Sequence, residues 1–168
     1  MKILYIGSGY VGTCSAAVMA DSGHDVLVYD IDERKIKMLA SNNAEEIESC
    51  LLEDGLCKML ANNKDRIKFT HNYKDVVNAL DDTDAVFMCL PTPEKEGAEG
   101  ESDLSYYCKA ADNLAENLIK RNNGKQSKYI VIVNKSTVPV NMISMTAKIM
   151  DEHGVINFGV VSNPEFLV

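Results

Sequence analysis

The chain has 168 residues, and 46% of them are apolar, which suits one domain of ordinary size with a substantial core. Its apolar runs are too short to cross a bilayer, and the run at the N-terminus is too short for a signal peptide, so no membrane partner is expected. The net charge of −8 argues against a nucleic-acid partner, which would favour a basic face.

The five cysteines are an odd number and form no C-x-x-C pair, so neither a zinc site nor any other metal site is expected. Unpaired thiols are typical of the cytoplasm, where conditions are reducing. Cys14 is expected on the apolar face of a helix and Cys89 within a strand, where burial would disfavour its thiolate. No cysteine has a neighbouring base that would make it a nucleophile.

Strand-like runs alternate with helix-like segments along the chain. In chain order, strands are expected at residues 2–6, 25–29, 67–70, 85–90, 129–133 and 158–161. Helices are expected at residues 10–22, 33–39, 73–80, 104–121 and 140–153. The segment at residues 43–64 is less regular, and its apolar positions suggest one short helix around Leu56, Met59 and Leu60.

This alternation predicts a parallel sheet, because each helix carries the chain back to begin the next strand in the same direction. The strands are continuous apolar runs, which is typical of a sheet covered by helices on both faces. Right-handed crossovers then give an α/β fold, a doubly wound parallel sheet of the Rossmann type. Asp32 is expected to cap the second helix, whose Arg34, Lys35 and Lys37 should be exposed.

A glycine-rich run, GSGYVG, joins the first strand to the first helix. Its Gly7, Gly9 and Gly12 have the spacing G-x-G-x-x-G. In this setting the first glycine allows a tight turn, the second lets a pyrophosphate approach the backbone, and the third lets helix and strand pack closely. The phosphates would lie at the helix N-terminus, where unpaired N–H groups favour negative charge. The alternative is a plain strand-to-helix turn.

Asp30 ends the second strand, where a dinucleotide-binding domain has the acid that binds the adenosine ribose hydroxyls. A carboxylate there would repel a 2′-phosphate, so the sequence predicts NAD rather than NADP as the cofactor. Arg34 and Lys35 keep the alternative open, because a nearby base accepts that phosphate. Otherwise the two basic residues belong to a solvated helix face.

Three later loops follow strands whose carboxyl ends lie at the same edge of the sheet as the glycine loop. They are LPTP at residues 90–93, NKSTVP at residues 134–139 and SNPEFL at residues 162–167. Their hydroxyls suit a nicotinamide ribose, a carboxamide or a water, although Ser136 and Thr137 could instead serve turn formation or helix capping. Glu165 is a candidate base or water-orienting acid, unless it is simply exposed to solvent.

Taken together, these motifs resemble the N-terminal domain of the UDP-glucose/GDP-mannose dehydrogenase family. The resemblance covers essentially the whole chain and rests on GSGYVG at residues 7–12, PTP at 91–93, DLSY at 103–106, STVPV at 136–140 and SNPEFL at 162–167. It implies oxidation of the C6 alcohol of a nucleotide sugar to a carboxylate, with two NAD used in succession. UDP-glucose is the favoured substrate, with GDP-mannose and UDP-N-acetyl-hexosamine as alternatives.

The resemblance also implies the roles of individual residues. The residues implied to contact NAD are Tyr10, Val11, Asp30, Lys35, Thr92 and Thr137. Thr137 would also help to hold a catalytic water, and Glu165 would act as a base or water-orienting acid in the hydrolysis of a covalent thioester. Both residues are expected to face the nicotinamide end of the cofactor.

The nucleophilic cysteine of the family lies in a segment of the type G-x-C-(F/L)-P-K-D, which none of the five cysteines matches. The chain is therefore expected to be the NAD-binding domain, residues 1–168, of an enzyme whose central and C-terminal domains carry the nucleophile, bind the sugar and support a homodimer. Two alternatives stay open: a dehydrogenase of the 6-phosphogluconate or 3-hydroxyisobutyrate type, and a non-catalytic NAD-binding domain.

Overall fold

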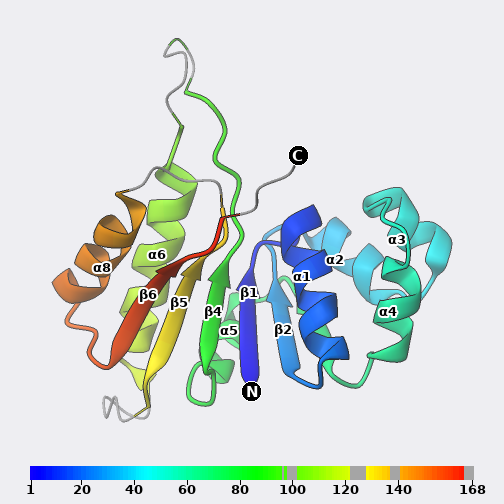
Figure 1. Ribbon diagram of the computed structural model, residues 1–168, viewed down its shortest axis with the longest axis horizontal. Helices are drawn as coiled ribbons and strands as arrows, with labels where there is room; N and C mark the ends of the chain where they lie inside the picture. The colour runs from blue at the N-terminus through cyan, green and yellow to red at the C-terminus, as the bar shows by residue number, and fades with distance from the viewer. Residues whose placement is uncertain (96, 98–101, 122–127, 137–140, 165–168) are drawn as a thin grey trace.

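The six predicted strands form one parallel sheet, drawn in Figure 1. The computed structural model describes residues 1–95, 97, 102–121, 128–136 and 141–164. The strands are β1 (Lys2–Ile6), β2 (Asp25–Tyr29), β3 (Ile67–Thr70), β4 (Ala85–Met88), β5 (Ile130–Asn134) and β6 (Phe158–Ser162). The helices are α1 (Tyr10–Asp21), α2 (Glu33–Ala40), α3 (Ala44–Cys50), α4 (Leu56–Asn62), α5 (Tyr73–Ala79), α6 (Ser105–Leu118) and α8 (Met142–Glu152). Within the described ranges, no helix has the length and apolar character needed to span a membrane.

The strand order is β3-β2-β1-β4-β5-β6. From β1 the chain adds β2 and then β3 on one side, and it then returns to the other side of β1 and adds β4, β5 and β6 outward in turn. Because each crossover is right-handed, the two directions place their helices on opposite faces of the sheet. Figure 1 shows α1 on the near side of the sheet, with α6 and α8 behind β4, β5 and β6. The arrangement confirms the doubly wound fold and puts its switch point between β1 and β4.

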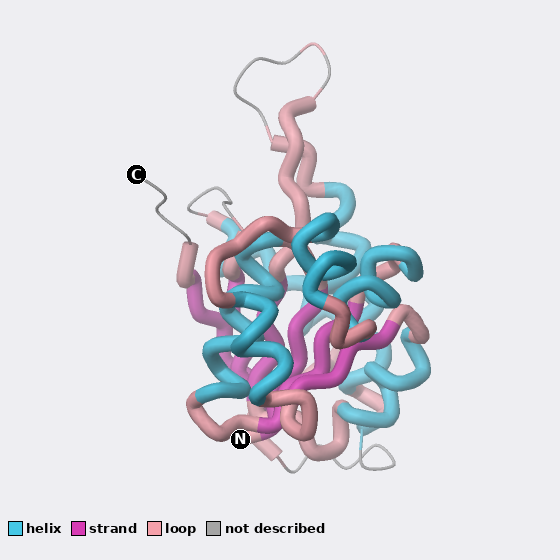
Figure 2. Tube along the Cα trace, turned by 90° about the vertical axis from the view of Figure 1, so that its right-hand side faces the viewer, coloured by secondary structure: helices cyan, strands magenta, loops and turns pink. Residues whose placement is uncertain are grey.

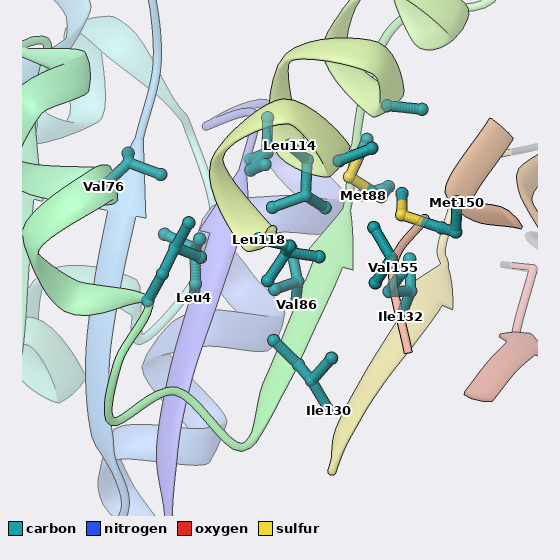
Figure 3. Packing of buried hydrophobic residues seen from close by; sticks show 14 of the residues in the cluster. Leu4, Val76, Val86, Met88, Leu114, Leu118, Ile130, Ile132, Met150 and Val155 are labelled. Carbon is teal, nitrogen blue, oxygen red and sulfur yellow. The ribbon is translucent and has the colours of Figure 1, made fainter. Parts of the chain in front are cut away.

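The alternation of side chains along β1 divides the core into two clusters. Leu4 and Ile6 belong to the cluster beneath α5, α6 and α8, where Leu114 of α6 is fully buried, as Figure 3 shows. Ile3 and Tyr5 point to the other face and pack with α1 and α4. The central strand is therefore buried on both sides, which fixes the sheet between its two helical layers.

The expectation that helices cover both faces of the sheet is correct only in part. The cluster beneath α1 and α4 includes no described residue of β5 or β6. On this side Val161 of β6 is 45% exposed, and the Tyr129 ring lies against Gly159, where an added Cβ would meet the tyrosine oxygen at 2.2 Å. Among the described residues, no helix lies over this face of β5 and β6. Tyr129 and Val161 therefore form an apolar strip there that is exposed to solvent.

The largest difference from the predicted elements lies between β2 and β3, where two helices form instead of one. The predicted short helix is α4, whereas α3 was not predicted because Ile47 is its one fully buried residue and its sequence has no apolar period. Its detectable signal is the N-cap: the Asn43 side chain accepts a hydrogen bond from the Glu45 N–H at 3.0 Å. Asp32 caps α2 as predicted, by accepting a hydrogen bond from the Lys35 N–H.

We predict that Leu114→Ala lowers the free energy of unfolding by about 2–5 kcal/mol, because it leaves a cavity between α6 and the sheet. Urea denaturation followed by circular dichroism measures the loss. Leu52→Ala is the matched control, since that side chain is 74% exposed, and it should change stability by about 0.5 kcal/mol or less. Equal losses in the two variants would contradict this description of the core.

Candidate functional site

A cleft of about 1730 Å³ opens at the carboxyl ends of the strands, beside the switch point between β1 and β4. The glycine loop, the end of β2 and the segments after β4 and β5 line it, and α6 forms one side. Figures 1 and 2 show residues 91–95 rising from this same edge of the sheet. The predicted cofactor-binding residues that line the cleft are Gly7, Gly9, Tyr10, Val11, Gly12, Asp30, Lys35 and Thr92.

The three glycines of the loop have different structural roles. Gly7 has a φ of +105°, and a Cβ there would lie 2.1 Å from the Cys89 carbonyl oxygen. A Cβ on Gly12 would lie 2.2 Å from the Gly7 carbonyl oxygen. By contrast, Gly9 has an ordinary φ of −69°, and an added Cβ would have no heavy atom within 4 Å. The fold therefore requires glycine at positions 7 and 12, whereas at position 9 the glycine leaves the cleft open to a ligand.

The N-terminus of α1 faces this open space. Gly9 is the N-cap residue and provides no side-chain hydrogen bond to the helix. The first N–H groups of an α-helix have no partner within the helix, and together with the helix dipole they favour an anion. This arrangement fits a pyrophosphate: a backbone cradle that a side chain at position 9 would fill, beneath the end of a helix.

Asp30 is held in place by four polar contacts. Its Oδ2 accepts hydrogen bonds from the backbone N–H and the hydroxyl of Ser8, both at 2.7 Å, and its Oδ1 accepts one from the Asp32 N–H at 3.0 Å. The Lys35 ammonium lies 3.7 Å from Oδ2. Burial acts to raise the pKa of Asp30, but the hydrogen bonds from Asp32 and Ser8 and the charge of Lys35 outweigh it and hold the pKa below its ordinary value. The group is thus a carboxylate at neutral pH.

The pairing with Asp30 changes the interpretation of Lys35. The prediction that Lys35 is exposed is wrong: its side chain is only 32% exposed, and it extends toward the carboxylate. Arg34 is exposed, as predicted for a solvated helix face. A 2′-phosphate bound near Lys35 would also meet Asp30, so the geometry favours a cofactor without that phosphate.

Polar side chains just past β4 and at the end of β5 tie the two strands to each other and tie β5 to α6 and α8. The Ser136 hydroxyl donates to the Leu90 carbonyl oxygen at 2.7 Å and accepts from the Leu90 N–H at 2.9 Å. At the end of β5, Asn134 accepts a hydrogen bond from the Tyr107 hydroxyl through Oδ1 and donates one to the Thr146 hydroxyl through Nδ2 at 3.2 Å. Burial raises the pKa of Tyr107 to about 12, so this phenol remains a donor.

Sequence reasoning missed two groups of residues here. Asn134 belongs to the predicted loop at residues 134–139, but its buried bond to Tyr107, which supports the end of β5 without lining the cleft, was not predicted. Helix α6 also contributes Tyr106, Lys109 and Asn113 to the cleft wall. Their i, i+3, i+7 spacing places them on one helix face, which becomes informative only once the position of α6 is known.

The predicted catalytic residues Thr137 and Glu165 lie outside the described residues. The prediction that Cys89 lies inside β4 is wrong, because the strand ends at Met88 and Cys89 is half-buried at the cleft wall. None of the five cysteines, all of which lie in described parts of the chain, forms a disulfide. Burial raises the pKa of Cys14, Cys50, Cys57 and Cys108, which keeps these thiols protonated at neutral pH. In the part of the chain that is described, no group of three or more His, Cys, Asp or Glu side chains could hold a metal ion.

Comparisons with known proteins agree with this cleft. Over residues 1–168 the sequence matches the family model described as the UDP-glucose/GDP-mannose dehydrogenase family, NAD binding domain. The UDP-glucose 6-dehydrogenase of Rhizobium meliloti (strain 1021) is 39% identical over 170 residues, which cover 99% of this chain and 35% of that protein. The chain thus spans about a third of the length of the curated dehydrogenases it matches.

Two solved structures share the fold across the chain. A ternary complex of GDP-mannose dehydrogenase from Pseudomonas aeruginosa has a TM-score of 0.82 and 28% identity, and the match covers 100% of this chain and 37% of that one. A UDP-glucose dehydrogenase from Pyrobaculum islandicum has a TM-score of 0.80 and 29% identity, and the match covers 99% of this chain and 36% of that one.

We predict that Gly9→Ala weakens NAD binding by about tenfold or more while the protein stays folded, because the new methyl group enters the space of the pyrophosphate. Isothermal titration with NAD and thermal unfolding together measure the two effects. Gly12→Ala is the matched control. Its Cβ would meet the Gly7 carbonyl, so it should instead lower stability by about 1–3 kcal/mol. Full NAD affinity in folded Gly9→Ala would mean that the loop is only a turn.

The lowered pKa of Asp30 predicts how stability responds to acid. A carboxyl whose pKa is lower in the folded than in the unfolded chain stabilises the fold above its unfolded pKa of about 3.9, and this contribution is lost as the pH falls through the lower folded value. Asp30→Asn should therefore cost about 1–3 kcal/mol at pH 7. The difference in the free energy of unfolding between wild type and variant should narrow below about pH 4. Urea unfolding at pH 7, 5, 4 and 3 measures this difference. A difference that does not change with pH would contradict a lowered pKa for Asp30.

Proposed function

Because the chain belongs to the UDP-glucose/GDP-mannose dehydrogenase family, as its NAD-binding domain, we propose that it forms the cofactor half of an active site that oxidises a nucleotide sugar. UDP-glucose is the substrate we favour. In the whole enzyme the C6 alcohol of the sugar would be converted to a carboxylate in two successive oxidations, each using one NAD. The curated relatives named UDP-glucose 6-dehydrogenase, at 38–39% identity, support this choice.

The observation that carries the proposal is the contact between Asp30 and Ser8. It brings the ribose-binding acid and the phosphate-binding loop into one cleft, at the switch point where a doubly wound sheet binds its ligand. Asp30 would bind the adenosine ribose, and the glycine loop would hold the pyrophosphate. Tyr10, Val11 and Lys35 line the same half of the cleft and are proposed to contact the cofactor there.

Bound NAD would supply the hydride acceptor, and the chain would orient it. From the pyrophosphate the cofactor would extend toward β4 and β5, where Thr92 lines the cleft. Thr137 and Glu165 follow β5 and β6 in the sequence, and we propose that they face the nicotinamide end. Thr137 would help to position a water, and Glu165 would act as the base or water-orienting acid.

The nucleophile would come from outside the matched region. The pKa of four of the five thiols is raised by burial, and none of the five has the motif that resembles the nucleophile of the family. Further domains that bind the sugar, homodimer formation and a cytoplasmic location are parts of this proposal. A role without nucleic acid or membrane fits the charge of −8.

GDP-mannose is the alternative substrate, and the specific observation in its favour is the fold match to the dehydrogenase that acts on it. Activity assays of the whole enzyme with both nucleotide sugars separate the two. A preference of about tenfold or more in kcat/KM for GDP-mannose would overturn the choice of UDP-glucose.

We predict that the 168-residue chain binds NAD more tightly than NADP and forms no NADH from UDP-glucose. Charge repulsion between Asp30 and the 2′-phosphate causes the first effect. The second follows because none of the five cysteines has the motif of the family's nucleophile. Isothermal titration with both cofactors and absorbance at the NADH band measure them. Equal or tighter binding of NADP would contradict the role of Asp30, and sustained turnover would place the nucleophile among the five cysteines.

In an enzyme that carries both halves of the site, Glu165→Gln should slow hydrolysis of the covalent thioester, because the amide cannot activate the water. Intact-protein mass spectrometry after mixing with UDP-glucose and NAD should then detect an adduct that the wild type does not accumulate. Unchanged turnover with no adduct would remove Glu165 from the catalytic set.

A further inference from the structure

The hydroxyl of Ser136 makes an unusually complete set of hydrogen bonds. It donates to the Leu90 carbonyl oxygen at 2.7 Å, lies 3.3 Å from the Met88 carbonyl oxygen, and accepts from the Leu90 N–H at 2.9 Å. The residue is only 8% exposed. Its hydrogen and one of its two lone pairs are thus used inside the protein, so this hydroxyl has no hydrogen left to donate to a cofactor.

These bonds begin where the sheet ends. Backbone pairing between β4 and β5 runs up to Met88 opposite Asn134. Beyond it, the N–H groups of Lys135 and Ser136 both donate to the Met88 carbonyl oxygen, at 3.0 and 3.2 Å. The Ser136 side chain then takes the place of a backbone partner for Leu90, and so extends the connection between the two strands past the last ladder pair.

The two strands are not fixed equally at this edge. The end of β5 is held from the α6 and α8 side, because Asn134 bonds to Tyr107 and Thr146. It is also tied to β6, since the Asn163 N–H donates to the Asn134 carbonyl at 2.9 Å. The segment after β4 rises from the sheet into a loop. The N–H of its first residue, Cys89, donates to the Ile6 carbonyl oxygen at 2.8 Å, and Ser136 holds the next residue, Leu90.

We infer that Ser136 is a positioning residue that fixes the segment from Leu90 to Thr92 as the wall of the nicotinamide half of the cleft. The inference rests on the proposed NAD-binding function. The adenosine half is set by Asp30 and the glycine loop, which lie at the ends of β2 and β1 and include none of the atoms that Ser136 bonds. Loss of the Ser136 hydroxyl should therefore affect one half of the cofactor and spare the other.

The test compares two ligands that share the adenosine and pyrophosphate groups. Ser136→Ala should weaken NAD binding about tenfold, equivalent to about 1.4 kcal/mol, because the Leu90 segment loses its anchor. ADP, which reaches only the first half of the cleft, should bind within about twofold of wild type. Isothermal titration of both ligands measures the ratio of the two dissociation constants. A general loss of structure would weaken both ligands alike, and that result, or unchanged NAD affinity, would overturn the inference.

Two further variants complete the design. Ser136→Thr keeps the hydroxyl and should restore most of the NAD affinity. Ser22→Ala removes a similar hydroxyl-to-carbonyl bond, to Val18 at 2.9 Å at the far end of α1, and should change neither ligand. If Ser136→Ala fails to fold, Ser136→Cys decides, because it replaces the hydroxyl with a thiol that makes weaker hydrogen bonds. A ratio of NAD to ADP affinity equal to wild type in Ser136→Cys overturns the inference. Wild-type protein that does not bind NAD would instead refute the proposed function.

Discussion

The carboxylate of Asp30 accepts hydrogen bonds from Ser8, so the end of β2 and the loop after β1 form one connected unit. Gly7, next to Ser8, lies directly against the Cys89 carbonyl, which brings β4 into the same unit. The ends of three strands thus constrain the loop before any ligand arrives. A site ordered in advance loses less conformational entropy on binding, and this is a main source of affinity for a small ligand.

Local signals in the sequence were sufficient for most of the fold. The apolar runs and the capping residue Asp32 correctly predict the strands, α2 and the doubly wound topology. Helix α3 was not predictable, because Ile47 alone of its residues is fully buried. The stability of this helix comes from its neighbours rather than from an amphipathic pattern. The glycine loop and Asp30 were predictable because their spacing along the chain reflects their chemistry.

The partners of these site residues were not predictable, because they come from distant parts of the chain. Lys35 looks like an exposed helix residue until its distance from Asp30 is known. In the sequence Ser136 reads as a hydroxyl for the cofactor or as a turn residue, and only the pairing of β4 with β5 brings it to Leu90. The exposed apolar strip on β5 and β6 could not be predicted for the same reason. Val160 and Val161 look alike in the sequence, but they point to opposite faces of the sheet.

The N-cap of α1 illustrates a conflict between folding and binding. For the stability of an isolated helix, serine, aspartate or asparagine is the best residue at this position, because its side chain bonds to the first free N–H groups. Space alone does not prevent such a residue at Gly9. A side chain there would, however, occupy the donors that an anionic ligand needs. Glycine at this one position therefore leaves the last step of helix capping to the ligand, so the helix reaches its full stability only when the site is occupied.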